Sequence, residues 1–204
     1  MTDAPQTPAR EISSIVPDTG GLKALAHPER LRMLALLRVD GPATASGLAR
    51  RLGLNSGATS YHLRQLAKHG FIEEAEGQGN ARERWWRARH ESTQYDTAAA
   101  EGEALEAGMA LTRALLAGQM QLLQAAQDDY PALPEEWRAA STASDAVIPM
   151  NAEAARAFQE KLMALIWEAK QAAPAPGGDL PEGARPFMVM LHAFPFPDLG
   201  EAGA

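Results

Sequence analysis

Residues 43–75 read ATASGLARRLGLNSGATSYHLRQLAKHGFIEEA, and the capping residues within them mark out two short helices. Thr44 is a suitable N-cap for a first helix of about two turns, which Gly53 would end. Asn55 is a suitable N-cap for a second helix over residues 55–69. Two helices joined by so short a turn predict a helix-turn-helix.

The second helix has two chemically different faces. Thr59, Leu63 and Leu66 recur at the spacing of one helix face and are expected to pack on a core. The other face is polar, and it carries Arg64, whose guanidinium can donate two hydrogen bonds to a guanine edge in the DNA major groove. The predicted DNA-binding residues of this helix are Ser56, Gly57, Ser60, Tyr61, His62, Arg64 and Lys68.

Two residues of this helix have a second interpretation. Gly57 costs about 1 kcal/mol of helix propensity relative to Ala, and either allows the backbone to approach DNA or reflects loose geometry in the first turn. His62 is either a structural residue or a phosphate contact. His62 and His69 lie two helical turns apart, roughly 10 Å, which is too far to share one metal ion. No metal site is predicted.

A β-hairpin is predicted directly after the second helix. Residues 71–75 and 83–88 have strand character and flank a glycine-containing turn. This hairpin would be a wing, and residues 77–84 of the wing present Arg82 and Arg84 to phosphates or to the minor groove. The alternative is a solvated charged hairpin. The two adjacent tryptophans of the returning strand should point to opposite faces, so one of them is expected in the core.

Helical patterns flank this region on both sides. Residues 22–26 form a first helix, and His27 before Pro28 is most simply the cap of the next one. Residues 97–127 form a long helix with one apolar stripe, which is either an intramolecular core or a dimer seam. A partner helix is favoured because little chain remains to cover the stripe. The predicted dimerisation residues are Leu105, Met109, Thr112, Leu116, Met120 and Leu123.

The end of the chain is expected to form a small α/β segment. Residues 143–150 and 187–194 have the character of strands, and Asn151 caps an amphipathic helix over residues 152–172. Aromatic residues in this segment are either packing anchors or the lining of a small-molecule pocket. The candidate effector pocket comprises Trp137, Trp167 and His192.

The predicted fold class is therefore mainly α (α+β), with four parts. They are a flexible N-terminal tail over residues 1–19, a winged helix-turn-helix domain over residues 20–95, a dimerisation helix over residues 96–128 and a C-terminal segment over residues 129–204.

The charge distribution separates the first helical region from the rest. The 204 residues carry a formal net charge of −7. Residues 20–92 contain 12 basic and 7 acidic side chains, which makes this region +5 and the remainder −12. A basic module predicts a polyanionic partner, here double-stranded DNA.

Several classes of protein are excluded by composition. There are no cysteines, so a disulfide scaffold, a thiolate metal site and cysteine catalysis are ruled out. Neither a signal-peptide pattern in residues 1–20 nor a membrane-length apolar run is present in the sequence, so a cytoplasmic location without membrane contact is expected. Common catalytic motifs are absent as well, and neither an enzyme nor a cofactor is predicted.

Taken together, the motifs LKALAHPERLRMLALL, GLARRLGL, SYHLRQLAKHGFIEE and RERWWRA resemble the ArsR-type winged helix-turn-helix regulators over about residues 20–95. The resemblance implies a homodimer that binds a two-fold operator, usually as a repressor. It also implies dimer contacts from residues 22–26 and 97–127. The sequence departs from the metal-sensing members, because residues 43–51 hold no cysteine and residues 97–127 hold no histidine.

Two other functions remain open at this point. One is a regulator whose C-terminal segment binds a small molecule. The other is a protein-interaction module on a winged-helix scaffold that does not bind DNA, which the acidic second half of the chain would suit.

Overall fold

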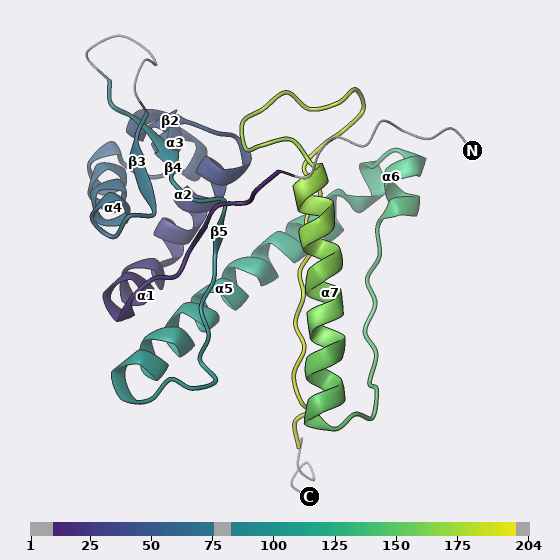
Figure 1. Cartoon of the computed structure of the whole chain (residues 1–204). Helices are drawn as coiled ribbons and strands as arrows, with labels where there is room; N and C mark the ends of the chain where they lie inside the picture. Colours follow the sequence, from purple (N-terminus) through teal and green to yellow (C-terminus); the bar gives the residue numbers. More distant parts are fainter. Residues whose placement is uncertain (1–9, 76–82, 199–204) are drawn as a thin grey trace, which may run out of the picture.

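The first half of the chain forms four helices and a small sheet, with helices that begin at the predicted caps Thr44 and Asn55. The computed structural model describes residues 10–75 and 83–198 (Figure 1). The helices of this half are α1 (Thr19–Leu25), α2 (Pro28–Val39), α3 (Ala45–Leu52) and α4 (Ser56–Lys68). An antiparallel sheet has the strand order β2 (Ala43–Thr44), β4 (Trp85–Ala88), β3 (Ile72–Glu74). The predicted winged helix-turn-helix fold is thus confirmed.

Side-chain caps define the turn between α3 and α4. Thr44 Oγ1 accepts a hydrogen bond from the backbone N–H of Gly47 at 3.1 Å, and Asn55 Oδ1 accepts one from the backbone N–H of Ala58 at 2.7 Å. Gly53 lies between the helices with φ of 67°, in the left-handed region that glycine adopts without strain. These local interactions set the angle at which α4 leaves α3.

The apolar faces of α1 to α4 meet the sheet in one core. Trp86 is 6% exposed and Trp85 is half-buried, so the two tryptophans divide between core and surface as predicted. The core also includes Ala107 and Leu111 of the long helix α5 (Gly102–Asp129), so the first half of α5 belongs to the domain. The largest fully buried side chains are Phe71, Met33, Leu34, Leu37, Leu63, Leu66, Leu111 and Thr59.

The helix α5 begins at Gly102 rather than at Thr97 as predicted. Local turn chemistry is the reason. The carboxylate of Asp96 accepts a hydrogen bond from the N–H of Ala98 at 2.7 Å, which competes with helix formation. The side chain of Thr97 also packs against Gly108 of α5, where no space remains for a Cβ.

The C-terminal part of the described chain is helical and extended but contains no strand. It comprises a 3₁₀ turn (Tyr130–Ala132), α6 (Glu135–Ala140) and α7 (Ala152–Ala172), and only α7 was predicted. The strands predicted at residues 143–150 and 187–194 are wrong. Both segments are extended, but no backbone group in them makes a hydrogen bond to a described residue. An apolar pattern favours an extended chain, whereas a strand also needs a neighbour with which to form a ladder.

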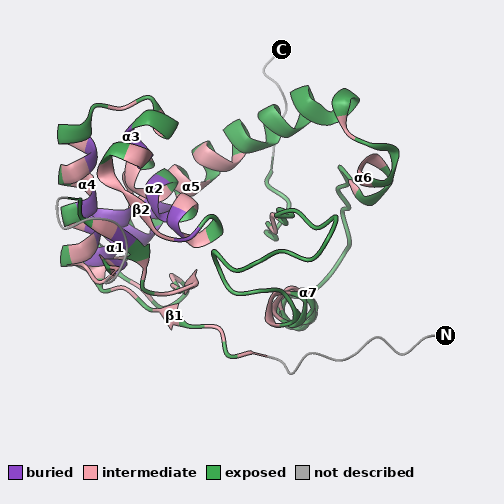
Figure 2. Cartoon of the chain, turned by 90° about the horizontal axis from the view of Figure 1, so that it is seen from above, coloured by how far each residue is buried: buried purple, intermediate pink, exposed green. Residues whose placement is uncertain are grey.

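Burial differs sharply between the two halves of the molecule. Buried residues concentrate in the winged helix-turn-helix domain, and among the described residues after Leu111 none is buried (Figure 2). Large apolar side chains are therefore exposed on α5, on α7 and in the extended segments. Exposed apolar surface of this extent is typical of a segment that is covered by a partner.

The predicted N-terminal tail is partly structured. Residues 1–9 lie outside the described part of the chain. β1 (Ser14–Ile15) pairs in parallel with β5 (Ser92–Thr93), and α1 already begins at Thr19. The expectation of a flexible tail over residues 1–19 was therefore wrong for its second half, because a strand pairing between distant residues was not visible in local sequence.

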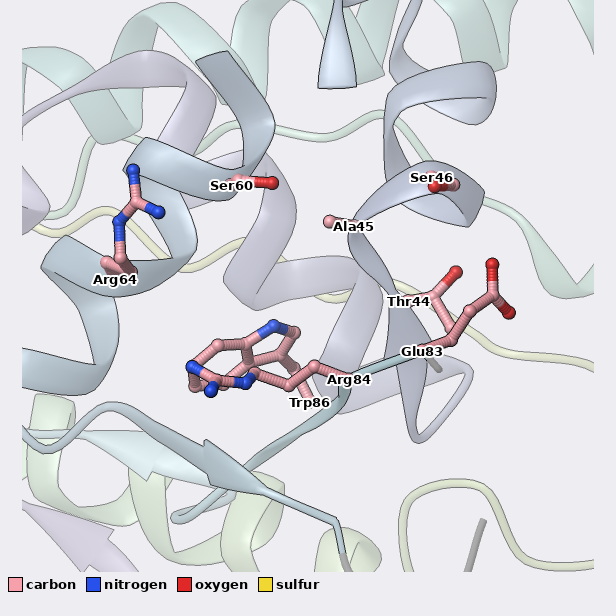
Figure 3. Close-up of a pocket in the computed structure, with 8 residues that line it drawn as sticks. All are labelled: Thr44, Ala45, Ser46, Ser60, Arg64, Glu83, Arg84 and Trp86. Atoms are coloured by element: carbon pink, nitrogen blue, oxygen red, sulfur yellow. The ribbon is translucent and has the colours of Figure 1, made fainter. Parts of the chain in front are cut away.

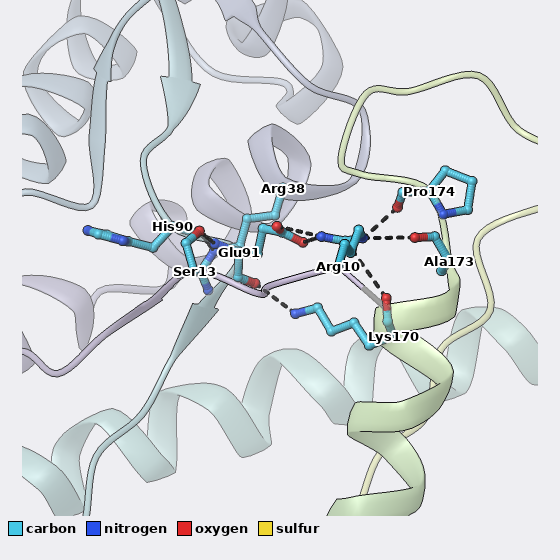
Figure 4. A network of polar contacts seen from close by, with 8 residues as sticks. All are labelled: Arg10, Ser13, Arg38, His90, Glu91, Lys170, Ala173 and Pro174. Carbon is cyan, nitrogen blue, oxygen red and sulfur yellow. Dashed lines mark hydrogen bonds and ion pairs between the residues drawn. The ribbon is translucent and has the colours of Figure 1, made fainter. Parts of the chain in front are cut away.

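Arg10 joins three segments that are distant in sequence (Figure 4). Its guanidinium donates to the Glu91 carboxylate at 2.6 Å and, at the end of α7, to the carbonyl oxygens of Lys170 at 3.3 Å and Ala173 at 2.8 Å. The ammonium group of Lys170 in turn donates to the carbonyl oxygen of Glu91 at 3.0 Å. The end of α7 is thereby attached to the winged helix-turn-helix domain next to β5.

Arg38 of α2 supports the same junction from inside the domain. Its guanidinium donates to the carbonyl oxygen of His90 at 2.9 Å and to Thr93 Oγ1 at 2.8 Å. Burial lowers the pKa of Arg38 to about 10, so the side chain stays charged at neutral pH.

Candidate nucleic-acid interface

The helix α4 is held in place by its inner face. Thr59, Leu63 and Leu66 are each 0% exposed and pack in the core, as the sequence predicted. The Thr59 hydroxyl donates to the carbonyl oxygen of Asn55 at 3.0 Å, which satisfies this buried polar group. The opposite face of α4 is therefore presented on a rigid element.

The outer face of α4 contains most of the predicted DNA-binding residues. Ser56, Gly57, Tyr61, Arg64 and Lys68 are exposed. Neither Arg64 nor Lys68 forms a hydrogen bond or ion pair with any described residue. Two unpaired cations one turn apart on a helix face are available to bind an anionic partner.

A surface pocket of about 480 Å³ separates α4 from α3 and the wing (Figure 3). Ser60 and Arg64 line it from α4, while Glu83 and Arg84 line it from the wing. The remaining lining residues are Thr44, Ala45, Ser46 and Trp86. The pocket thus brings together α4, the N-terminus of α3 and the start of β4.

Sequence reasoning did not single out the α3 contribution to this pocket. Thr44 was recognised only as a cap, and Ser46 was not recognised at all. The available signal was the exposed serine in the first turn of α3, where free backbone N–H groups and the helix dipole favour a phosphate.

The wing contributes one predicted residue that the structure describes. Arg84 is exposed, lies 3.3 Å from the Glu74 carboxylate and stacks with its guanidinium carbon 5.6 Å from the centre of the Trp86 ring. The ion pair is exposed to solvent and therefore contributes little to stability. Arg84 remains free to exchange its partner for a phosphate, whereas Arg82 lies outside the described residues.

His62 lies between the outer and inner faces of α4. Its ring packs on His27, with ring centres 4.5 Å apart, and on Tyr61, with centres 5.6 Å apart. His27 caps α2 as predicted, because its Nδ1 accepts a hydrogen bond from the N–H of Glu29 at 3.2 Å. Burial is the main cause that lowers the pKa of both histidines, so both rings are neutral at neutral pH.

The predicted dimer seam lies on the surface of α5. Leu105, Met109, Leu116, Met120 and Leu123 are 38 to 71% exposed. Thr112 is different, because its hydroxyl lies 2.9 Å from the hydroxyl of Tyr95 in the same chain. Five of the six residues thus point away from the core of their own domain, and the reading of the stripe as an intramolecular core is wrong.

No aromatic ring contact among the described residues joins the three residues of the candidate effector pocket. Trp137 lies with its ring centre 6.4 Å from that of Phe187 and 4.8 Å from the Arg185 guanidinium carbon. Trp167 is 5.4 Å from the ammonium group of Lys170, and His192 is exposed. Each of the two tryptophans thus has a neighbour of its own, which is compatible with the packing interpretation.

No group of three or more His, Asp or Glu side chains in residues 10–75 and 83–198 is placed to hold a metal ion. Within those same residues no helix has the length and apolar character needed to cross a membrane.

Comparison with known proteins places the first half of the chain. Residues 25–75 match a sequence family described as "Helix-turn-helix domain". This segment contains the helices α2, α3 and α4 of the winged helix-turn-helix fold. It resembles the HTH-type transcriptional regulator YgaV of Escherichia coli (strain K12), with 40% identity over 52 residues, 26% of this chain and 52% of that protein. The chain spans about half the length of this curated relative.

Two solved structures each match part of this chain. Reduced HlyU from Vibrio cholerae N16961 is 24% identical, with a TM-score of 0.30, and the match covers 46% of this chain and 83% of HlyU. The homodimeric winged helix-turn-helix domain of Mb0332 from Mycobacterium bovis is 23% identical, also with a TM-score of 0.30, and the match covers 54% of this chain and 77% of that fragment.

Proposed function

We propose that this protein is a sequence-specific DNA-binding transcriptional regulator of the ArsR type. The observation that carries the proposal is the outer face of α4, where Arg64 and Lys68 are exposed and unpaired by any described residue. An α-helix with this surface fits the DNA major groove, and Arg64 is long enough to reach base edges. The similarity of this domain to a transcriptional regulator supports the same function.

The pocket beside α4 adds a route for the DNA backbone. Ser46 in the first turn of α3 and Arg84 directly before β4 line the same pocket as Arg64, and both can bind phosphates. The phosphate contacts would orient α4, while Arg64 would read the sequence. Glu83 adds an acceptor in the same pocket, and a carboxylate can accept a hydrogen bond from cytosine.

Binding to DNA is expected to weaken steeply with salt. If Lys68 and Arg84 each contact one phosphate in both copies of a dimer, log K should fall with log salt with a slope of at least about −3.6. Operator fragments selected from a genomic DNA pool, titrated between 50 and 200 mM salt by fluorescence anisotropy, provide the measurement.

Substitution of Lys68 provides the control for this slope. Lys68→Gln should weaken binding to all fragments alike. For a dimer, the slope of log K against log salt should become less negative by about 1.8. Binding that does not depend on salt, or no enriched fragment, would favour the protein-interaction module instead.

The regulator is proposed to act as a homodimer through the exposed stripe of α5, and as a repressor. Leu116, Met120 and Leu123 continue along the second half of α5, where no described residue is buried. A two-fold pairing of these residues would remove apolar side chains from water and present two α4 helices to one operator. Repression follows when such a dimer covers a promoter.

Glutamates introduced into the apolar stripe of α5 should dissociate the proposed dimer. The double substitution Met120→Glu with Leu123→Glu places like charges together and is expected to weaken dimerisation about 100-fold or more. The matched control is Gln121→Glu with Ala125→Glu, because these exposed residues lie on the opposite face of α5. Sedimentation velocity would distinguish the 21.8 kDa chain from its dimer. A wild-type protein that is monomeric at micromolar concentration would contradict the proposed seam.

A small-molecule effector remains a second candidate function for the C-terminal segment. The observation that favours it is the attachment of α7 to the domain through Arg10, which would transmit a movement of α7 to the neighbourhood of β5. A thermal-shift screen of the full chain, followed by operator titration with each hit, tests this function.

A further inference from the structure

Two imidazole rings meet where the recognition helix crosses the start of α2. His27 lies directly before Pro28 and caps α2, and His62 lies on α4. Their ring centres are 4.5 Å apart and their planes are inclined by 48°. The contact joins residues that are far apart in sequence. It links α4 to the start of α2 through side chains that are not part of the hydrophobic core.

Hydrogen bonding fixes the protonation state of His27. Its Nδ1 accepts the backbone N–H of Glu29, so this nitrogen carries no proton and the ring proton is on Nε2. A doubly protonated ring could not accept this hydrogen bond. The cap of α2 therefore requires a neutral His27.

The surroundings of His62 lead to the same tautomer. Its Nδ1 is buried and has no hydrogen-bond partner among the described residues, whereas Nε2 is not a buried atom without a partner in that part of the chain. A buried N–H without an acceptor costs more than a buried nitrogen without a proton that makes weak contacts. The proton of His62 is therefore on Nε2, and a second proton on Nδ1 would have no acceptor.

The charged groups around the pair come mostly from the first turn of α2. Arg30 approaches both rings and donates to the carbonyl oxygen of Ala24 at the end of α1. The negative charge of Glu29 raises the pKa of both rings, whereas Arg30 lowers it. Glu29 also forms an ion pair with Arg32 at 3.4 Å. On α4 itself the neighbour is the hydroxyl-bearing ring of Tyr61, which faces the edge of His62. The positive charge of Arg30 disfavours a charged imidazole here.

We propose that His27 and His62 form a neutral histidine pair that positions the recognition helix, and that DNA binding weakens with falling pH because protonation of either ring disrupts the pair. His62 is then a positioning residue rather than a phosphate contact. This inference rests on the proposed DNA-binding function. It predicts the reverse of the usual pH dependence, since a histidine on a phosphate binds more tightly once it is charged.

The first test measures operator affinity between pH 7.5 and pH 5.5 at constant salt with the whole 204-residue chain. The affinity of the wild type is expected to fall about fivefold over this range. His27→Gln and His62→Gln should each weaken binding at pH 7.5 and reduce this pH dependence by at least half. His90→Gln is the matched control, because burial also lowers the pKa of His90 but its ring is not part of the α4 contact. The control should bind as the wild type does at every pH.

The double variant distinguishes a pair from two independent contacts. If the rings act together, His27→Gln with His62→Gln should bind at pH 7.5 no more weakly than the weaker single variant, within about twofold. Losses that multiply would overturn the pair. An affinity that rises as the pH falls, and that stops rising in His62→Gln, would show a phosphate contact instead and would also overturn it.

The last test needs no DNA and so separates this inference from the proposed function. Long-range proton–nitrogen NMR spectra of the free protein report the tautomer of each histidine. At pH 7 both His27 and His62 should be neutral and protonated on Nε2. A charged ring or an Nδ1–H tautomer at either residue would overturn the pair even if DNA binding is established. If both tautomers are as expected and no DNA binds, the proposed function fails and the pair stands as a structural contact without the positioning role.

Discussion

Replacing Arg64 with alanine should abolish most of the sequence preference of the protein without lowering its stability. The side chain is exposed and makes no hydrogen bond or ion pair with a described residue, so its removal costs the folded state little. Loss of a bidentate contact to a guanine costs about 1–3 kcal/mol at each half-site. Because both copies of a dimer carry the change, operator affinity should fall at least about thirtyfold.

The measurement compares the operator with a fragment in which the contacted guanines are replaced. Arg64→Ala should bind both fragments alike, whereas the wild type should prefer the operator. Arg64→Lys keeps the charge but not the planar fork, so it should retain the salt dependence and lose most of the discrimination. Arg156→Ala is the matched control, since Arg156 is an exposed arginine on α7, outside the winged helix-turn-helix domain. Operator affinity of Arg64→Ala within twofold of the wild type would contradict the role assigned to Arg64.

Local chemistry made the helix-turn-helix predictable from sequence. Thr44 and Asn55 cap helices by reaching backbone N–H groups only three residues away, and Gly53 adopts the left-handed conformation of a helix end. The division of α4 into an inner and an outer face depends only on helical spacing. For these reasons the fold and the exposed position of Arg64 were predicted from sequence.

Contacts between distant residues were not predictable in the same way. The stacking of His62 on His27 and the attachment of Arg10 to the end of α7 depend on how whole elements pack. The pocket behind Arg64 likewise needs α3, α4 and the wing in place. For residues 187–194 the sequence predicts a strand that the structure does not contain. The apolar pattern favours an extended chain, but the described chain supplies no neighbouring strand for it to pair with.

Replacing Leu111 with alanine should give the largest loss of stability among the changes considered. Leu111 is 0% exposed and is the point at which α5 enters the core of the winged helix-turn-helix domain. Truncation of a buried leucine removes apolar contacts and leaves a cavity, which costs about 2–5 kcal/mol of the free energy of unfolding. For a chain of this length the melting temperature should fall by roughly 5–15 °C, as measured by circular dichroism.

The effect of Leu111→Ala on DNA binding separates the core from the interface. At a temperature where the variant is fully folded, its operator affinity should stay within about threefold of the wild type, because Leu111 touches the core and not α4's outer face. Leu165→Ala is the matched control, because Leu165 is also a leucine but is 63% exposed on α7. Its truncation should change the free energy of unfolding by about 0.5 kcal/mol or less. If Leu111→Ala melts with the wild type, the first half of α5 does not belong to the domain core. If Leu165→Ala is destabilised as strongly as Leu111→Ala, then Leu165 is covered in the assembled dimer, and the exposed apolar surface of α7 would join α5 as part of the interface between the two copies.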